Sequence, residues 1–518
     1  MTRRLILPAL AGVLLAASFP PVGLGWLAWV ALVPLLAALD GQPWRQGALS
    51  AFVFGFVYFL GTVYWVVNSM FFYGGISLTL SVPIMLLLVA FLALYPAAFG
   101  LFLALVGRGG RVAGLLAAPT AWTALELLRS HMFTGFPWAL VGYTQARVLP
   151  VIQIADVFGV WGVSFLVVAV NAVLALWLRR LLAGRRGAAP VGEAVAVAVM
   201  LTLTIAYGFM RIGEVDERAG GWEGLTVGVA QGSIDQSVKW DPSRRAETIG
   251  IYSDLSRRAA SEGAGLIVWP ETAVPFYLGA EPEDSRRVED AARTAGAYIL
   301  TGSPSFSFPE KGSAPEFFNS AYLLDPGGTA TGRYDKVHLV PFGEYVPMRK
   351  VLFFISKLTE GVGDFTPGPG PIPITFRDSG LGVLICYESI FPELARRYAA
   401  RGAGLLVVIT NDAWFGRTSA PYQHFEMAVM RAVENRTYLV RAANTGISGV
   451  IDPAGRVKRE TSLFERTVFT ERVALRGGPV SVYTAWGDVF AYLCLVFSGA
   501  LVLRKIFSKG DVSRCSKR

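Results

Sequence analysis

The sequence predicts a bundle of about eight transmembrane helices that carries one α/β domain. The mean hydropathy is +0.47, and only 16% of the 518 residues are charged, against roughly 25% in ordinary soluble domains. Apolar runs of the ~20 residues that a helix needs to cross a bilayer fill residues 1–211 and return near the C-terminus. Between them, residues 222–480 alternate short apolar runs with charged helical stretches, which is typical of a layered α/β domain.

Eight apolar runs are candidate spans. They lie at about 5–20, 24–40, 47–68, 77–106, 112–129, 159–180, 191–211 and 485–504. The first run also resembles a signal peptide, because Arg3 and Arg4 precede it. No small-residue cleavage site followed by a soluble domain appears, and we expect the run to be retained as a span.

Basic residues concentrate beside the apolar runs and predict the orientation of the chain. Residues 1–211 hold 12 arginines and four acids, and the tail 504–518 holds six basic residues and one acid. This distribution favours a membrane over a nucleic acid as the partner, and it places both termini in the cytoplasm and the large insert outside. The predicted parts are seven helices in 1–211, a catalytic domain in 212–483, an eighth helix in 484–508 and a basic cytoplasmic tail in 509–518.

Three polar residues near the end of the fifth run have two interpretations. Glu126 and Arg129 stand at the helical spacing of an ion pair. They can form a local pair at the membrane interface, which we favour, or contact a headgroup or substrate. His131 has the same two interpretations.

The insert contains recognisable strands, helices and loops. Strand-like runs include Leu225–Ala230, Gly265–Trp269, Tyr298–Thr301, Ala321–Leu324, Leu381–Cys386 and Leu405–Thr410. Helix-like segments include Arg244–Glu262, Glu283–Ala295 and Pro392–Arg401. Stretches 303–316 and 360–373 are rich in proline and glycine and predict loops. The second loop, which also carries aromatic residues, is equally consistent with a mobile apolar flap and with a plain surface loop.

Three residues stand where strands end, and ligands of open α/β domains bind beyond the carboxyl ends of strands. Glu271 and Cys386 each follow an apolar strand, and Lys336 stands in a third such position. A thiol is a good nucleophile only as thiolate, a carboxylate can remove its proton, and an ammonium can stabilise the oxyanion of a tetrahedral intermediate. Taken singly, they are more often a turn glutamate, a buried cysteine and a surface lysine, so only their joint appearance indicates a site.

Cysteine and histidine contents limit the other chemistries. The three cysteines are Cys386, Cys494 in an apolar run and Cys515 in the tail, so the insert has no internal disulfide. The only histidines are His131, His338 and His424, without paired ligand spacing. We therefore expect no metal and no cofactor.

The order of Glu271, Lys336 and Cys386 resembles the Glu-Lys-Cys triad of the nitrilase superfamily. The resemblance extends to NDAWFG at 411–416 and RAANTG at 441–446. With spans before and after, the whole chain resembles the apolipoprotein N-acyltransferase family. Further similar segments are GFPW at 135–138, QG at 231–232, KWDP at 239–242 and VPFGEYVP at 340–347. The resemblance implies that the α/β domain is a nitrilase-like αββα sandwich.

The resemblance also implies a two-step reaction in the bacterial inner membrane, with the catalytic domain in the periplasm. Cys386 would take an acyl chain as a thioester from a membrane phospholipid, phosphatidylethanolamine above all. The N-terminal amine of a diacylglyceryl-cysteine on an apolipoprotein would then accept that chain, giving a triacylated lipoprotein. Such a ping-pong course is typical of a covalent intermediate, and spans that hold a site near the membrane raise the effective concentration of lipid-anchored substrates.

The resemblance assigns a role to each site residue. Glu271 would be the base, Lys336 the oxyanion stabiliser and Cys386 the nucleophile. Supporting roles are expected for Glu344, Tyr387, Glu388 and Asn319. Trp240 and Trp414 resemble substrate-contacting aromatic residues, although a packing role is about as probable for either. Two other functions compete with acyl transfer: a membrane-tethered amidase or nitrile hydrolase, and a transporter or scaffold whose outer domain only binds.

Overall fold

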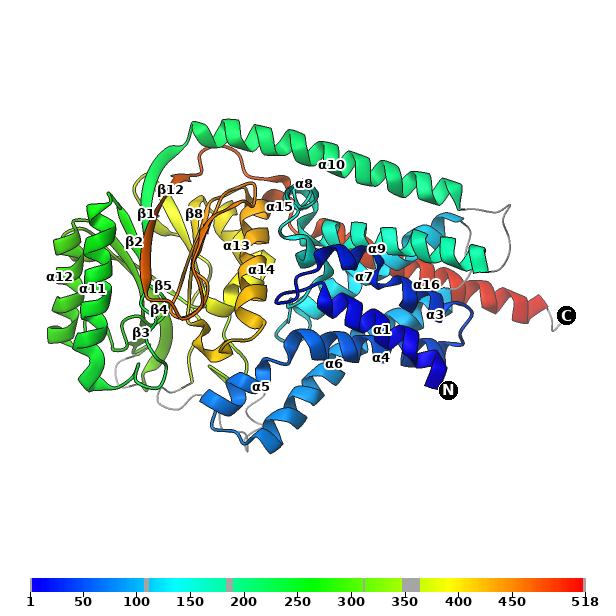
Figure 1. The fold of residues 1–518 in the computed structure, drawn as a ribbon, viewed down its shortest axis with the longest axis horizontal. Helices are drawn as coiled ribbons and strands as arrows, with labels where there is room; N and C mark the ends of the chain where they lie inside the picture. The colour runs from blue at the N-terminus through cyan, green and yellow to red at the C-terminus, as the bar shows by residue number, and fades with distance from the viewer. Residues whose placement is uncertain (1, 107–110, 183–189, 311–312, 347–363, 516–518) are drawn as a thin grey trace. The chain divides into compact units, whose positions relative to one another are not determined.

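The computed structural model describes residues 2–106, 111–182, 190–310, 313–346 and 364–515. The chain forms two compact units, drawn in Figure 1. One unit comprises Met1–Val67, Thr79–Ile212 and Trp486–Arg518, and the other comprises Asn68–Leu78 and Gly213–Ala485. The second unit therefore takes its residues from two separate parts of the sequence.

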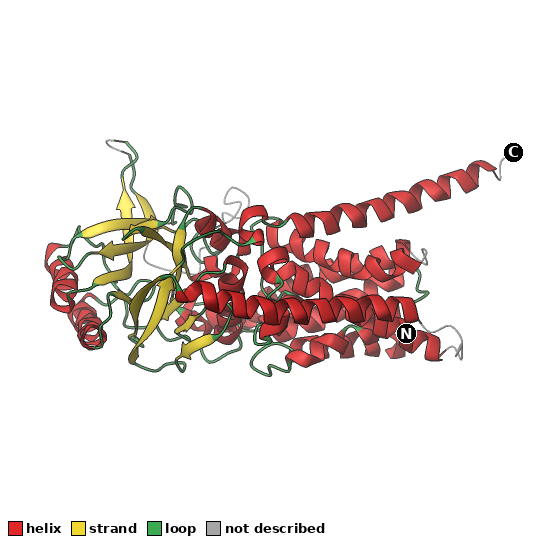
Figure 2. Cartoon of the chain, turned by 90° about the horizontal axis from the view of Figure 1, so that it is seen from above, coloured by secondary structure: helices red, strands yellow, loops and turns green. Residues whose placement is uncertain are grey.

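The first unit is helical, as the red ribbons in Figure 2 show. From the N-terminus, the helices outside the α/β part of the chain are α1 (Thr2–Ala17), η1 (Gly25–Leu27), α2 (Ala28–Ala31), α3 (Val33–Leu39), α4 (Trp44–Val63), α5 (Val66–Asn68), η2 (Ser69–Tyr73), α6 (Leu78–Val106), α7 (Arg111–His131), η3 (Val141–Gln145), α8 (Leu149–Ile152), α9 (Ala155–Leu182), α10 (Val191–Gly220), α15 (Val482–Trp486) and α16 (Val489–Cys515). Of these, η2 and all but the last residue of α15 belong to the second unit, and the unit boundaries fall within α5, α6 and α10.

Five helices among the described residues are long and apolar enough to cross a membrane: α4, α6, α9, α10 and α16. This finding supports a membrane-embedded helical region but does not confirm the predicted count of about eight spans. The run at 24–40 is divided among η1, α2 and α3, and α1 has only 16 residues. The run at 112–129 forms α7, which carries two charged side chains in its second half.

Those side chains, Glu126 and Arg129, hold a neighbouring connection. An Oε1 atom of Glu126 accepts a hydrogen bond from the backbone N–H of Val141 at 2.8 Å. Arg129 donates to three backbone carbonyls in the 136–139 segment at 2.6 to 3.4 Å. Both side chains are buried, and each binds the backbone of this connection, so the structure gives them a structural task. His131 bonds to the backbone carbonyl four residues earlier, at 3.0 Å.

The second unit is built on two six-stranded sheets. The first has the order β12-β1-β2-β3-β4-β5 and the second the order β11-β10-β9-β8-β7-β6. The strands are β1 (Glu223–Gln231), β2 (Leu266–Val268), β3 (Tyr298–Ser307), β4 (Glu316–Leu324), β5 (Ala330–Asp335), β6 (Ile374–Phe376), β7 (Ser379–Ile385), β8 (Ala403–Thr410), β9 (Leu439–Ala443), β10 (Gly449–Ile451), β11 (Val457–Glu460) and β12 (Thr467–Leu475). In each sheet three neighbouring strands are parallel and the outer pairs are antiparallel.

Helices cover the outer faces of both sheets, which gives the αββα layering visible in Figure 1. One layer holds α11 (Arg245–Ser261) and α12 (Pro282–Ala295), and the other holds α13 (Pro392–Ala400) and α14 (Ala420–Asn435). Short 3₁₀ segments lie in three of the connections between strands and helices: η4 (Pro242–Arg244), η5 (Cys386–Ile390) and η6 (Asp412–Phe415). The expected nitrilase-like sandwich is therefore present.

Local sequence explains these elements. All eight residues of β8 are buried, as expected for a parallel strand that is covered on both faces. Helix α12 has acids in its first turn, Arg293 in its last turn and Gly296 at φ +60° as its C-cap, which match the helix dipole and the left-handed cap. Each predicted strand-like run lies in or overlaps an observed strand, but β5, β6 and β9–β12 were not among those runs.

The two predicted loops differ in outcome. Stretch 303–316 becomes a loop only after Ser307, because β3 extends through Pro304, which pairs with Asn319. Of stretch 360–373, residues 360–363 lie outside the described residues. The described remainder is fastened to the domain, with Thr366 N donating to the carbonyl of Phe317 at 2.7 Å.

Candidate active site

The three predicted triad residues follow the ends of three different strands. Glu271 comes after β2, Lys336 directly after β5, and Cys386 directly after β7. Cys386 adopts the left-handed conformation, with φ +52°, which costs a non-glycine residue about 1 kcal/mol or more. Strain of this kind persists only where the surrounding structure enforces it. The backbone therefore turns sharply at the cysteine.

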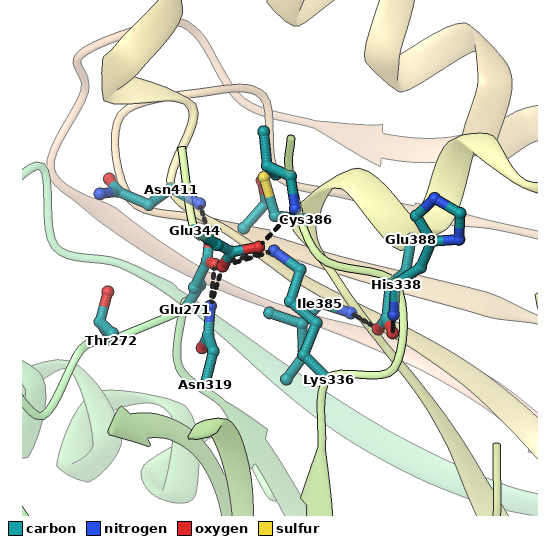
Figure 3. Close-up of polar contacts among 12 residues, drawn as sticks. Glu271, Thr272, Asn319, Lys336, His338, Glu344, Ile385, Cys386, Glu388 and Asn411 are labelled. Atoms are coloured by element: carbon teal, nitrogen blue, oxygen red, sulfur yellow. Dashed lines mark hydrogen bonds and ion pairs between the residues drawn. The ribbon is translucent and has the colours of Figure 1, made fainter. Parts of the chain in front are cut away.

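Figure 3 shows the side chains of these residues converging, with Glu344 and Asn319 among them. Lys336 Nζ lies 3.0 Å from Glu344 Oε1 and 3.8 Å from Glu271 Oε1. Asn319 Nδ2 donates to Glu271 Oε1 at 2.8 Å and to Glu344 Oε1 at 2.9 Å. One ammonium and one amide thus hold two carboxylates together, away from water.

The second carboxylate oxygen of Glu271 has its own partner. It accepts a hydrogen bond from the backbone N–H of Asn411 at 2.9 Å. Both oxygens of this glutamate are therefore fixed by groups from different sheets, because Asn319 lies in β4 and Asn411 follows β8. These hydrogen bonds fix the orientation in which the carboxylate of Glu271 can act as a base.

Burial and neighbouring charges set the protonation states. Burial raises the pKa of the Cys386 thiol, the charge of Glu271 raises it further, and Lys336 lowers it. For Lys336 burial lowers the pKa, but the carboxylates of Glu344 and Glu271 more than offset this, and the pKa rises well above its ordinary value. Lys336 thus remains charged, while the thiol at rest keeps its proton until a base removes it.

Glu388 joins the cysteine turn to the lysine loop. Its Oε1 accepts from Tyr334 Oη at 2.7 Å and from the backbone N–H of Val337 at 2.7 Å. Its Oε2 accepts from the backbone N–H of Ile385 at 2.8 Å. Burial raises the pKa of Glu388, although these hydrogen bonds and Lys336 oppose the rise. This side chain fixes the spacing between the loops that carry the nucleophile and the ammonium.

The predicted aromatic residues lie at the periphery of this polar centre. Tyr387 packs edge to face on Phe391, with ring centroids 5.1 Å apart. Trp414 packs edge to face on Tyr73 at 5.4 Å. Trp240 is exposed over 43% of its surface.

Comparisons with known proteins agree with this architecture. A family model described as the apolipoprotein N-acyltransferase N-terminal domain matches residues 11–173, and one described as carbon-nitrogen hydrolase matches residues 226–477. An apolipoprotein N-acyltransferase of Geobacter metallireducens is 46% identical over 97% of this chain and 94% of its own length. The chain belongs to the apolipoprotein N-acyltransferase family. The Methylococcus capsulatus protein of the same name is 36% identical over 94% of this chain and 93% of its own.

Two solved structures are similar to part of this N-acyltransferase family member. A carbon-nitrogen hydrolase from Helicobacter pylori is 20% identical, with a TM-score of 0.39, and covers 52% of this chain and 95% of its own. Saccharomyces cerevisiae Nit3, of the nitrilase superfamily, is also 20% identical with a TM-score of 0.39, and covers 49% of this chain and 90% of its own.

Behind the nucleophile, this N-acyltransferase family member has a buried polar network that sequence reasoning missed. His424 Nε2 lies 3.2 Å from the backbone carbonyl oxygen of Cys386, and its Nδ1 lies 3.2 Å from Asp412 Oδ1. Arg441 donates to Asp412 Oδ2 at 2.7 Å. The desolvation of Asp412 is outweighed by the charge of Arg441 and the contacts with His424, which lower the pKa of its carboxyl.

This network supports the strained turn at Cys386, because His424 contacts the backbone carbonyl of that residue. All three side chains are fully buried or nearly so, and buried charges persist only when they are paired. The segments NDAWFG and RAANTG supply two of the three members, so the motif signal was present in the sequence. Their pairing with His424 depends on the packing of α14 against the sheet, which residue spacing does not reveal.

Proposed function

We propose that this chain transfers an acyl chain from a membrane phospholipid, through a thioester on Cys386, to the N-terminal amine of the diacylglyceryl-cysteine of an apolipoprotein. The observation that carries the proposal is the convergence of a strained, buried cysteine with Glu271 and Lys336 at the strand ends of an αββα domain. Membership of a family whose relatives are named apolipoprotein N-acyltransferase supports the choice of acceptor.

The first half-reaction forms the acyl-enzyme. Glu271 removes the thiol proton of Cys386, and the thiolate attacks the ester carbonyl of the donor lipid. The oxyanion that develops is stabilised by the ammonium of Lys336. The carbon–oxygen bond of the ester then breaks, and the glycerol oxygen takes the proton from Glu271, which releases a lysophospholipid. We propose phosphatidylethanolamine as the donor.

The second half-reaction transfers the acyl chain. The neutral amine of the acceptor attacks the thioester carbonyl, and Glu271 takes the proton that the nitrogen loses. The carbon–sulfur bond breaks, and the thiolate that leaves is protonated by Glu271. The products are an N-acylated lipoprotein and the free enzyme. Glu344, Glu388, Asn319 and Tyr387 position the reacting groups, and Trp240 and Trp414 contact the substrates.

The fate of a labelled acyl chain tests this function. The purified full-length protein, in vesicles that contain phosphatidylethanolamine labelled in its sn-1 acyl chain, is expected to acquire label as a hydroxylamine-sensitive thioester. Addition of a diacylated lipopeptide with a free N-terminus is expected to move that label to the peptide, and an N-acetylated peptide is the matched control. Release of label only as free fatty acid would instead indicate a membrane-tethered hydrolase, and no enzyme-bound label would indicate a binding protein.

We also propose eight spans, with both termini in the cytoplasm and the α/β unit in the periplasm of a bacterial inner membrane. The basic residues that flank the apolar helices support this orientation. A cysteine placed at exposed Ser261 at the end of α11 is expected to react with a membrane-impermeant maleimide in intact spheroplasts. Labelling only after lysis would instead place the α/β unit in the cytoplasm.

A further inference from the structure

One segment near the site has an inverted pattern of burial. Val238 and Trp240 expose 37% and 43% of their surfaces, whereas Lys239 between them exposes only 3%. Lysine is almost never fully buried unless it is paired, and exposed apolar side chains gain nothing from folding. The pattern therefore opposes stability at three consecutive positions, which indicates that another requirement maintains it.

The buried side chain of Lys239 reaches the turn that carries the proposed base. Its Nζ donates to the backbone carbonyl of Glu271 at 3.1 Å and to Thr272 Oγ1 at 2.8 Å. Thr272 is itself in the left-handed conformation, with φ +45°. The lysine thus binds both residues of a strained turn, and neither bond is to a carboxylate. Its charge is not neutralised by its hydrogen-bond partners.

The backbone around Lys239 is fastened to the same strand end that holds Glu271. Gln236 Oε1 accepts from Asn411 Nδ2 at 2.7 Å. The backbone N–H of Asn411 in turn donates to Glu271 Oε2 at 2.9 Å. The lysine is therefore held in register with the base by a second connection, and it cannot leave the turn without disturbing that connection.

Lys239 contacts the turn as an ammonium at neutral pH. Burial lowers its pKa to about 8, while the negative charges of Glu271 and Cys386 oppose that decrease. The side chain therefore keeps its proton at pH 7 and donates to the Glu271–Thr272 turn.

We propose that Lys239 is a positioning residue for acyl transfer, which holds the Glu271–Thr272 turn so that the carboxylate of Glu271 is presented to Cys386. This role rests on the proposed function, because it assigns a task to Lys239 only if Cys386 is the nucleophile. Lys336 lies beside the carboxylate of Glu271, whereas Lys239 binds the backbone carbonyl of the same residue.

The rate of thiol alkylation tests the proposal. The full-length protein is treated with iodoacetamide, and modification of Cys386 is followed by peptide mass spectrometry. Lys239→Met removes the charge and the donors, Lys239→Gln keeps a donor without the charge, and Lys239→Arg keeps the charge. Lys458→Met, at an exposed lysine in β11, is the matched control.

We expect Lys239→Met to lower the rate of Cys386 alkylation at pH 7.5 about tenfold, because a displaced Glu271 removes the thiol proton less effectively. Lys239→Gln and Lys239→Arg, which keep a donor to the turn, and Lys458→Met should stay near the wild-type rate.

Three results would overturn the proposal. These are a wild-type alkylation rate in folded Lys239→Met, an equal loss of rate in Lys239→Met and Lys239→Arg, and loss of a cooperative melt in Lys239→Met and Lys239→Gln while Lys239→Arg folds. The last result would assign the lysine to folding alone. Because alkylation needs no lipid, these results are distinct from a failure of the labelled-lipid experiment, which concerns the substrates.

Discussion

Replacing Cys386 with alanine is expected to abolish acyl-enzyme formation, because no sulfur remains at this position to carry the thioester. The measurement is the initial rate of label incorporation from phosphatidylethanolamine, with Cys494→Ala as the matched control. Cys494 is also a buried cysteine without a disulfide, but it lies in α16, and its replacement should leave the rate unchanged. Equal labelling of both variants would remove Cys386 from the reaction.

The same position also tests the strain at the nucleophile. Glycine tolerates a φ of +52° without the steric cost that alanine bears. We therefore expect Cys386→Gly to be more stable than Cys386→Ala by about 1 kcal/mol, although both are inactive. A lower melting temperature for the glycine variant would show that the turn is not strained. The expected order would mean that the protein holds its nucleophile in place at a cost in stability.

Much of the fold was predictable, because hydrophobic pattern reports burial directly. The continuous apolar run of β8 and the charged helices α11 and α12 were each recognised from local sequence. Strands β10 and β11 were not, since they are three and four residues long and a run of that length has no distinctive period. The span count is not confirmed, because the apolar run at 24–40 contains glycine and proline and divides into three short helices.

The candidate site was predictable in its members but not in its supports. Glu271, Lys336 and Cys386 were found because each follows a strand, and strand ends of one domain meet at one edge. Lys239 was noticed only within a motif, since nothing in KWDP distinguishes a buried lysine from a solvated one. Its burial results from tertiary contacts with the Glu271 turn, which no local pattern encodes.

Replacing Lys336 with methionine is expected to lower acyl-enzyme formation by about 10²- to 10³-fold, the usual effect of removing one group that stabilises an oxyanion. The side chain is 1% exposed and is the cation that lies within 4 Å of both Glu271 and Glu344. Its loss leaves two buried carboxylates that share the Asn319 amide, and breaking a buried pair costs about 3–5 kcal/mol. Activity and stability should therefore both decrease.

The double variant Lys336→Met/Glu344→Gln separates the charge of Lys336 from its packing. Without the ammonium, the carboxylates of Glu271 and Glu344 share one buried site, and an uncompensated buried charge destabilises the folded state. The melting temperature of Lys336→Met should therefore fall below that of the wild type. The double variant should regain stability without regaining activity, since it removes the repulsion but not the need for a cation beside the oxyanion. An equal loss of stability in the single and double variants would instead mean that Lys336 acts through packing.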